Sequence, residues 1–177
     1  MMGTKMDGAD TSGYFLEPGY MYFSRYPVKV RTVLGSSVTV CIWDRRRRYG
    51  GINHFLYPSI KDPSLATPKY GNVAVPALIR IMKEEGCSSS DLVAQIFGGA
   101  DPKGSKDTEL GVKNVDIARR ALSAHKIAVI SEDVGGVMGR KIIFDIGSGE
   151  AAVLKVHQIR KTDWLVEPDI ELAKQEG

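Results

Sequence analysis

The segment from Val28 to Pro58 constrains the fold more than any other part of the chain. A tight Leu-Gly-Ser-Ser turn ending at Ser37 is followed by an apolar run, Val38–Trp43, whose β-branched and aromatic residues are typical of a buried strand. A polar connection leads to Gly50–Leu56, which has the composition of a return strand. The pattern predicts a β-hairpin whose return strand brings His54 back beside the turn.

A hydroxyl at a sharp turn that faces an imidazole is the minimal arrangement of nucleophile and base. The residues alone leave a plainer alternative open, in which Ser37 is an ordinary turn serine and His54 an ordinary strand histidine. The choice between these interpretations depends on the rest of the chain.

Two segments, LGSSVTVCIWD and GGINHFLYP, resemble LGSCVAVCLYD and GGMNHFMLP of the chemoreceptor glutamine deamidase family (CheD) of bacterial and archaeal chemotaxis. The resemblance continues in the same order through QIFGGAD, GVKNVDIARRAL and EDVGGVMGRKIIFD, and it spans Phe15 to Val156. One position departs from the family pattern. Where the family has its nucleophilic cysteine, this chain has Ser37.

In the family, a cysteine is activated by a histidine, and a threonine completes the triad. The resemblance implies that Ser37, His54 and Thr32 stand at these three positions. If the threonine is placed one residue earlier, as in some members, the position falls on Arg31 instead. The activity implied is a protein-glutamine glutaminase, an amidohydrolase that converts receptor glutamine side chains to glutamate and releases ammonia.

Acyl transfer also needs donors for the tetrahedral oxyanion, and backbone N–H groups at a glycine turn suit that task. We therefore expect Gly35 and Ser36 to contribute to substrate binding. The resemblance implies that Gly98 and Gly99, like the later Gly135-Gly136 pair, lie near the cleft and shape its opening.

Serine changes the expected chemistry, because a hydroxyl cannot become a thiolate and needs a base oriented by a carboxylate. We expect the Ser37 form to be inactive. Three interpretations stay open: an engineered inactive form, a natural non-catalytic member, and a true serine deamidase.

With 177 residues and a net charge of +3, the chain fits one domain and does not indicate nucleic-acid binding by charge. We expect a disordered leader at Met1–Gly13, a single CheD-like domain at 14–159, and a weakly packed C-terminal tail at 160–177. The chain has no apolar run long enough to insert into a membrane, and the N-terminus does not resemble a signal peptide. These features favour a cytoplasmic protein.

Only two cysteines are present, Cys41 and Cys87, which do not form a disulfide framework. Cys41 lies in the apolar run, about 13 Å along the strand from Ser37, and is expected in the core. His125 and His157 have no partners at metal-ligand spacing, so we predict neither a metal site nor a cofactor.

Two helices are predicted among the strands. The first has Pro76 in its first turn, Leu78, Ile81 and Met82 on one face, and ends at Gly86. The second runs from Val112 to Ala124, with an apolar stripe that begins at Val112. Further strands are predicted at Gly19–Phe23, Leu92–Phe97, Ile127–Ile130, Lys141–Ile146 and Ala151–Ile159. The irregular spacing favours an α+β fold, and the resemblance implies a layered α/β sandwich of mixed and antiparallel sheets with flanking helices.

The resemblance implies two partners, the cytoplasmic domain of a methyl-accepting chemoreceptor and a CheC-type phosphatase. A non-catalytic adaptor that binds either partner is the alternative to an enzyme. The run Arg45–Arg48 is expected to be a solvated connection, with a possible role in steering an acidic partner toward the cleft. No aromatic platform accompanies the run, so nucleic-acid binding is not predicted.

Overall fold

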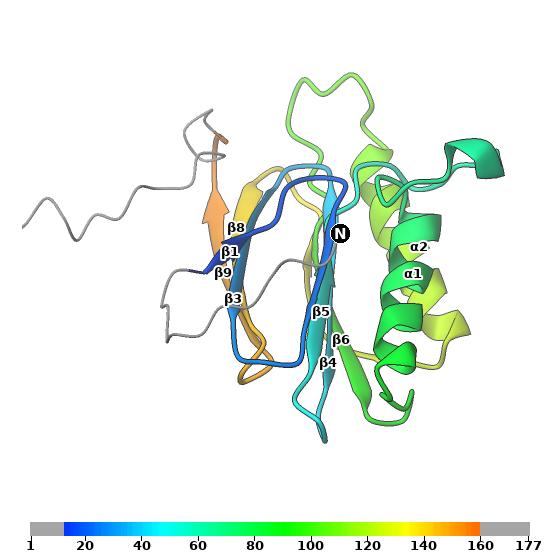
Figure 1. Cartoon of the computed structure of the whole chain (residues 1–177). Helices are drawn as coiled ribbons and strands as arrows, with labels where there is room; N and C mark the ends of the chain where they lie inside the picture. Colours follow the sequence, from blue (N-terminus) through cyan, green and yellow to red (C-terminus); the bar gives the residue numbers. More distant parts are fainter. Residues whose placement is uncertain (1–12, 160–177) are drawn as a thin grey trace, which may run out of the picture.

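Residues 13–159 are described by the structure, a computed structural model. Two sheets and a layer of helices are stacked, and the helices cover the outer face of the larger sheet (Figure 1). The smaller sheet has the order β1-β3-β8-β9 and the larger sheet β2-β5-β4-β6-β7. The elements are β1 Tyr14–Phe15, β2 Met21–Ser24, β3 Lys29–Leu34, β4 Val38–Asp44, β5 Gly50–Asn53, a 3-10 turn Pro63–Leu65, α1 Gly71–Glu84, β6 Leu92–Gly98, α2 Leu110–Ala124, β7 Ala128–Val134, β8 Gly139–Asp145 and β9 Glu150–Val156.

Both sheets are mixed. The pairs β1–β3 and β6–β7 are parallel, and the other strand pairs are antiparallel. The predicted α+β class and the layered sandwich are therefore confirmed. Residues 1–12 of the predicted leader and the whole predicted tail, 160–177, lie outside the described residues, so the division into leader, domain and tail stays a prediction.

The predicted hairpin is present as β4 and β5, which pair with Cys41 opposite Ile52. The return strand is shorter than predicted, because regular pairing ends at Asn53 and only an isolated bridge joins Val38 to Phe55. The predicted hairpin across Gly147-Ser148-Gly149 is confirmed as β8 and β9. The remaining strand predictions differ mainly in their ends. Neither the short β1 nor β3, which carries Thr32, was predicted as a strand.

Alternation along β4 divides the core into two clusters. Val38, Val40 and Ile42 pack toward the helices, whereas Cys41 packs between the two sheets with Ile52 of β5. Full burial of a valine or isoleucine side chain contributes about 1.5–3 kcal/mol to stability. Because alternate residues share a face, the side chain of Ser37, just before β4, also points between the sheets.

The prediction for the start of the first helix is wrong. Helix α1 begins at Gly71, so Pro76 lies inside the helix and removes the hydrogen bond that its N–H would make to the Asn72 carbonyl. The N-cap is Tyr70, whose side chain makes no capping hydrogen bond. Without a polar cap residue, the sequence carried no start signal at this point.

The apolar faces of both helices also differ in one position from the prediction. In α1, Leu78 and Met82 are buried but Ile81 is only partly buried. In α2, Val112 is 55% exposed, whereas Gly111 is buried. Glycine is needed at position 111 because a Cβ there would stand 2.3 Å from Gly99 O, in the loop that follows β6.

Substitution of Gly98 tests how closely the end of β6 packs against the turn that carries Ser37. A Cβ at Gly98, where φ is +108°, lies 2.2 Å from the Ser37 carbonyl oxygen. We expect Gly98→Ala to lower the free energy of unfolding by about 2–4 kcal/mol, from backbone strain and overlap together. The measurement is chemical denaturation. Gly104→Ala is the matched control, since its φ is +84° with no atom within 4 Å, and should show the smaller cost of strain alone. Equal losses in the two variants contradict the expected overlap.

Candidate active site

Ser37 lies at the end of the turn that crosses from β3 in one sheet to β4 in the other. Two backbone hydrogen bonds from the next loop hold this turn. Gly99 N donates to Ser37 O at 2.9 Å, and Ala100 N donates to Gly35 O at 3.0 Å. Ser37 is only 6% exposed, so its hydroxyl is fixed in an almost closed environment.

His54 follows β5 and is fully buried between the sheets. Its backbone pairs with the segment before β2, through His54 N to Tyr20 O at 3.1 Å and Gly19 N to His54 O at 2.7 Å. On the other side, the Asn53 side chain accepts a hydrogen bond from Val40 N at 3.0 Å, in place of a backbone carbonyl. The backbone around His54 is therefore held from both neighbouring strands.

The structure brings the three predicted triad residues together. The Ser37 hydroxyl lies 2.8 Å from His54 Nε2, and the Thr32 hydroxyl lies 2.8 Å from His54 Nδ1. Thr32 is buried and points inward from β3, whereas its neighbour Arg31 is exposed. Of the two candidates for the third position, Thr32 is thus the residue that contacts the imidazole.

The hydrogen bonds around Thr32 fix the histidine tautomer. Thr32 Oγ1 donates its one proton to the Leu16 carbonyl at 2.8 Å. Its oxygen must therefore accept from His54 Nδ1–H, which leaves Nε2 unprotonated. Nε2 then accepts from the Ser37 hydroxyl, so the imidazole presents its basic nitrogen to that oxygen.

Burial lowers the pKa of His54 from its ordinary value of 6.5 to about 3. Burial is the cause of this lowered pKa, and no carboxylate among residues 13–159 pairs with the ring to raise it again. At neutral pH the imidazole is therefore uncharged and competent as a base. An imidazolium at this place has no negative neighbour to stabilise it.

The turn also offers backbone donors. Within the described part of the chain, the N–H groups of Gly35, Ser36 and Ser37 donate to no acceptor. Gly35 and Ser36 are partly exposed, and Ile159 lies beside Gly35, with its Cδ1 3.7 Å from where a Cβ would stand. Unpaired backbone N–H groups of this kind are the donors that an oxyanion requires, and their role in substrate binding stays a prediction.

The two glycine loops adjoin the turn that carries Ser37. Gly99 N donates to Ser37 O. The second loop, at Gly135-Gly136, contacts the first, since Gly135 N donates to Gly98 O at 2.9 Å. Arg140 of β8 holds this second loop by donating to Gly135 O at 2.9 Å and to Met138 O at 3.1 Å. The loops adjoin the turn and leave its N–H groups unpaired.

One residue that contacts the site was missed by the sequence analysis. Asn114 of α2 is fully buried, and its amide donates to Ser36 O and to Leu56 O, each at 2.9 Å. A polar residue within an otherwise apolar helix face was the available signal.

The other cysteines and histidines are separate from this arrangement. Burial raises the pKa of the Cys41 thiol far above its ordinary value. Burial, as the largest cause, and a hydrogen bond to Asp44, as the next, raise the pKa of the Cys87 thiol to about 12. Both thiols are thus poor nucleophiles. His157 is exposed and His125 partly exposed. Among the residues that the structure describes, no cluster of three or more His, Cys, Asp or Glu side chains suits a metal ion.

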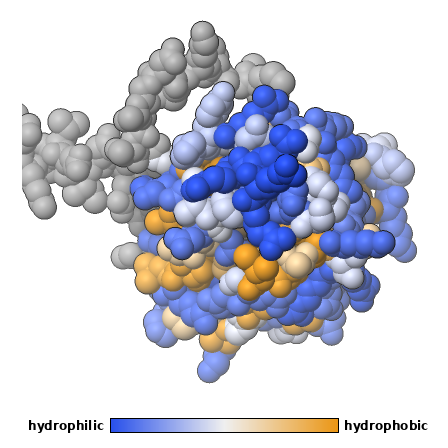
Figure 2. Space-filling view, turned by 90° about the horizontal axis from the view of Figure 1, so that it is seen from below, coloured by the Kyte–Doolittle hydropathy of each residue, from blue (hydrophilic) through white to orange (hydrophobic). Residues whose placement is uncertain are grey.

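The arginine run lies at the opposite end of β4 from Ser37, about 23 Å away at 3.3 Å per residue. All four arginines are exposed, and Figure 2, seen from that end, shows hydrophilic residues across the middle of the face. Arg45 donates to Ser90 O, and Arg48 donates to Gly147 O. The four arginines are exposed, as expected for a solvated connection, and their possible steering of an acidic partner stays a prediction.

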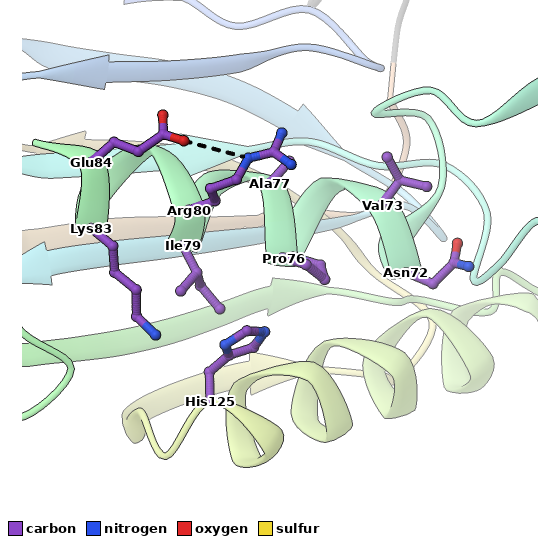
Figure 3. Close-up of a pocket in the computed structure, with 9 residues that line it drawn as sticks. All are labelled: Asn72, Val73, Pro76, Ala77, Ile79, Arg80, Lys83, Glu84 and His125. Atoms are coloured by element: carbon purple, nitrogen blue, oxygen red, sulfur yellow. Dashed lines mark ion pairs between the residues drawn. The ribbon is translucent and has the colours of Figure 1, made fainter. Parts of the chain in front are cut away.

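A groove of about 740 Å³ lies on the helical layer, not at the triad (Figure 3). It is lined by α1 from Asn72 to Glu84 and by His125, which follows α2. An exposed ion pair, Arg80 with Glu84 at 3.9 Å, lies along one side. None of the predicted site residues lines the groove.

The fold and geometry define an α+β protein with a buried hydroxyl–imidazole–hydroxyl chain at one end of its sheets. The sequence matches a family described as "CheD chemotactic sensory transduction" over residues 58–155. A probable chemoreceptor glutamine deamidase CheD of Sulfurimonas denitrificans is 36% identical over 153 residues, 85% of this chain and 96% of the relative. The protein of that name from Trichlorobacter lovleyi is 39% identical over 82% of this chain and 92% of its own. The chain belongs to the CheD family.

Among solved structures, the Bacillus licheniformis hypothetical protein YfiH aligns with 64% of this chain and 49% of its own, with a TM-score of 0.45 and 15% identity, which establishes nothing about function. Within residues 13–159, neither helix is long and apolar enough to span a membrane.

The buried imidazole predicts a pH dependence of stability. The unfolded chain takes up a proton on His54 below about pH 6.5, whereas the folded chain does so only near pH 3. The contribution of the neutral, buried His54 to the free energy of unfolding is therefore complete above about pH 6.5. It is lost as the pH falls toward 3, by up to about 1.4 kcal/mol per pH unit. Urea denaturation at fixed pH values should show a shallower acid loss in His54→Gln than in the parent.

The matched control is His157→Gln, since this exposed imidazole remains in contact with water in both states. It should follow the parent curve. Parallel acid limbs for the parent and His54→Gln are incompatible with a neutral, buried His54.

Proposed function

We propose that this chain acts in chemotaxis in the cytoplasm, where it recognises the cytoplasmic domain of chemoreceptors, and that Ser37 leaves it unable to deamidate their glutamines. The observation that carries the proposal is the contact of His54 Nε2 with a serine oxygen, in a site where none of residues 13–159 supplies a carboxylate to the imidazole. The names of its relatives, probable chemoreceptor glutamine deamidases, support the receptor as partner.

Deamidation at such a site is acyl transfer. The nucleophile at position 37 attacks the carboxamide carbon and gives its proton to His54 Nε2. The imidazolium returns that proton to the departing nitrogen, so that ammonia leaves. Water, deprotonated by the same nitrogen, then cleaves the acyl-enzyme to give glutamate and restores residue 37. Every step uses groups of the chain and water, and no metal or cofactor is required.

The remaining members of the site have supporting roles in this proposal. Thr32 orients the imidazole and fixes the tautomer with Nε2 free. The unpaired N–H groups of the turn at Gly35–Ser37 stabilise the oxyanion. Gly98 and Gly99 border the turn and shape the opening for a glutamine side chain.

Serine fails in this environment for an energetic reason. Its attack requires the buried imidazole to become charged while the hydroxyl proton is removed. With a pKa of about 3, an imidazolium is disfavoured here by about 5 kcal/mol relative to water. A carboxylate at the third position would offset this cost, but Thr32 is uncharged. A cysteine avoids much of the cost, since its thiolate forms readily and stands directly beside the imidazolium.

The alternative function is a non-catalytic adaptor that binds chemoreceptors or a CheC-type phosphatase. Ser37 favours the adaptor function, because the contacts among Ser37, His54 and Thr32 are all present while position 37 carries no thiol. The two functions share their partners and differ only in whether position 37 supports chemistry when it carries a thiol.

The decisive prediction concerns activity. We expect the chain to bind a purified receptor cytoplasmic domain without converting glutamine to glutamate, and Ser37→Cys alone to confer conversion. The two side chains are similar in shape, so the difference should appear in the bond-making step and not in binding. Peptide mass spectrometry of the receptor measures the conversion, with Ser37→Ala as the control for binding without a nucleophile.

Comparable conversion rates for the serine and cysteine forms refute inactivity and support a serine deamidase. If the cysteine form converts none of several receptors and yet binds them, the adaptor function is supported.

A second prediction tests the contact between residues 37 and 54. In Ser37→Cys, the new thiol should react with iodoacetamide at pH values below the ordinary thiol range near 8.5, because thiolate and imidazolium stabilise each other. Adding His54→Ala should return the reactivity to that range. Peptide mapping separates this thiol from the buried Cys41 and Cys87, which serve as internal controls. A profile independent of His54 contradicts the pairing.

A further inference from the structure

Asn114 joins the two segments that carry Ser37 and His54. It belongs to α2, a different layer of the fold, and its side chain reaches the carbonyl of Ser36 and the carbonyl of Leu56. Ser36 immediately precedes the nucleophile position, and Leu56 follows the histidine by two residues. One amide group thus spans the two backbone segments whose separation sets the 2.8 Å contact.

We propose that Asn114 is a positioning residue of this site, which holds the Ser37 turn and the His54 segment at a fixed separation. This inference rests on the proposed function of the Ser37–His54 pair.

Only an uncharged amide satisfies this place. Two carbonyl oxygens converge on Nδ2, and an NH₂ group supplies one proton to each. Turning the amide over would place its own oxygen against both carbonyls, so its orientation is fixed by these acceptors. An aspartate of the same size has no proton to donate and would repel both oxygens.

Two donated bonds account for an amide at this position. Asn114 Oδ1 is buried and has no hydrogen-bond partner among the described residues, which costs about 1–3 kcal/mol. Asparagine is also a poor helix former. An aliphatic residue would avoid both costs but would leave the carbonyls of Ser36 and Leu56 without this donor. The bonds to these two carbonyls are therefore the physical reason for an amide here.

Helix α2 packs close to the turn that carries Ser37 because Gly111 and Gly99 lie in backbone contact. A Cβ at Gly111 would stand 2.3 Å from Gly99 O, and a Cβ at Gly99 would stand 2.9 Å from Gly111 O. The start of α2 therefore lies directly against the loop that bonds to Ser37. This close contact brings Asn114, one turn later in α2, within reach of Ser36.

The test uses the unmodified Ser37 chain and reads the imidazole directly. Nuclear magnetic resonance of ¹⁵N-labelled protein, assigned with His54→Gln, should show His54 as a single neutral tautomer with a protected Nδ1–H. In Asn114→Leu, which preserves bulk but not the donors, we expect exchange of that proton to become about tenfold faster or more, with both tautomers populated. Circular dichroism and thermal melting establish that the variant is folded, and Asn114→Ala replaces it if it is not.

Gln95→Leu is the matched control. Gln95 is also a buried amide that donates to a backbone carbonyl, Gly149 O at 2.8 Å, but that bond lies at the far end of the sandwich near the β8–β9 turn. Its replacement should lower stability without changing the His54 tautomer. An unchanged tautomer in a folded Asn114 variant, or an equal change in Gln95→Leu, overturns the positioning role.

A second readout connects the inference to chemistry. In the Ser37→Cys background, Asn114→Leu should move the pH profile of alkylation toward that of His54→Ala, whereas Gln95→Leu should not move it. If Ser37→Cys fails to deamidate receptors but its His54 tautomer still depends on Asn114, the proposed function fails and the positioning role stands.

Discussion

The structure depends on a neutral imidazole buried where two sheets meet. His54 has no water to hydrate it, so both ring nitrogens must find partners within the protein. Thr32 comes from one sheet and His54 from the other, while Ser37 ends the turn that connects the sheets. A relative shift of the sheets breaks at least one of these bonds. The same contacts that satisfy buried polar groups therefore fix the site's geometry.

Much of this geometry could be predicted from local sequence. The apolar run after Ser37 and the glycine pair before His54 determine a hairpin, and a hairpin sets which residues lie opposite each other. Thr32 was the expected third residue, but the alternative register on Arg31 stayed open until the side chain that β3 turns inward was known. The start of α1 could not be predicted, because Tyr70 provides no cap and Pro76 suggested a later start.

The longest-range features were beyond the sequence for a different reason. Asn114 and Ser36 are 78 residues apart, and their contact depends on how α2 packs against the Gly98-Gly99 loop. No local pattern specifies such a meeting of layers. The arginine run shows the converse case: its exposure followed from composition, but its distance from the cleft followed from the direction of β4.

Position 37 separates the shape of a site from its chemistry. The Ser37 hydroxyl makes the hydrogen bond to Nε2, and in the proposed function it differs from a thiol at that place in chemistry and not in shape. The difference lies in where charge can exist. Burial that lowers the pKa of His54 keeps water away from the ring but also opposes an isolated imidazolium. A thiol resolves this conflict because its own negative charge forms beside the ring. In the proposed function, a hydroxyl at the same place leaves the conflict unresolved, since Thr32 contributes orientation without charge.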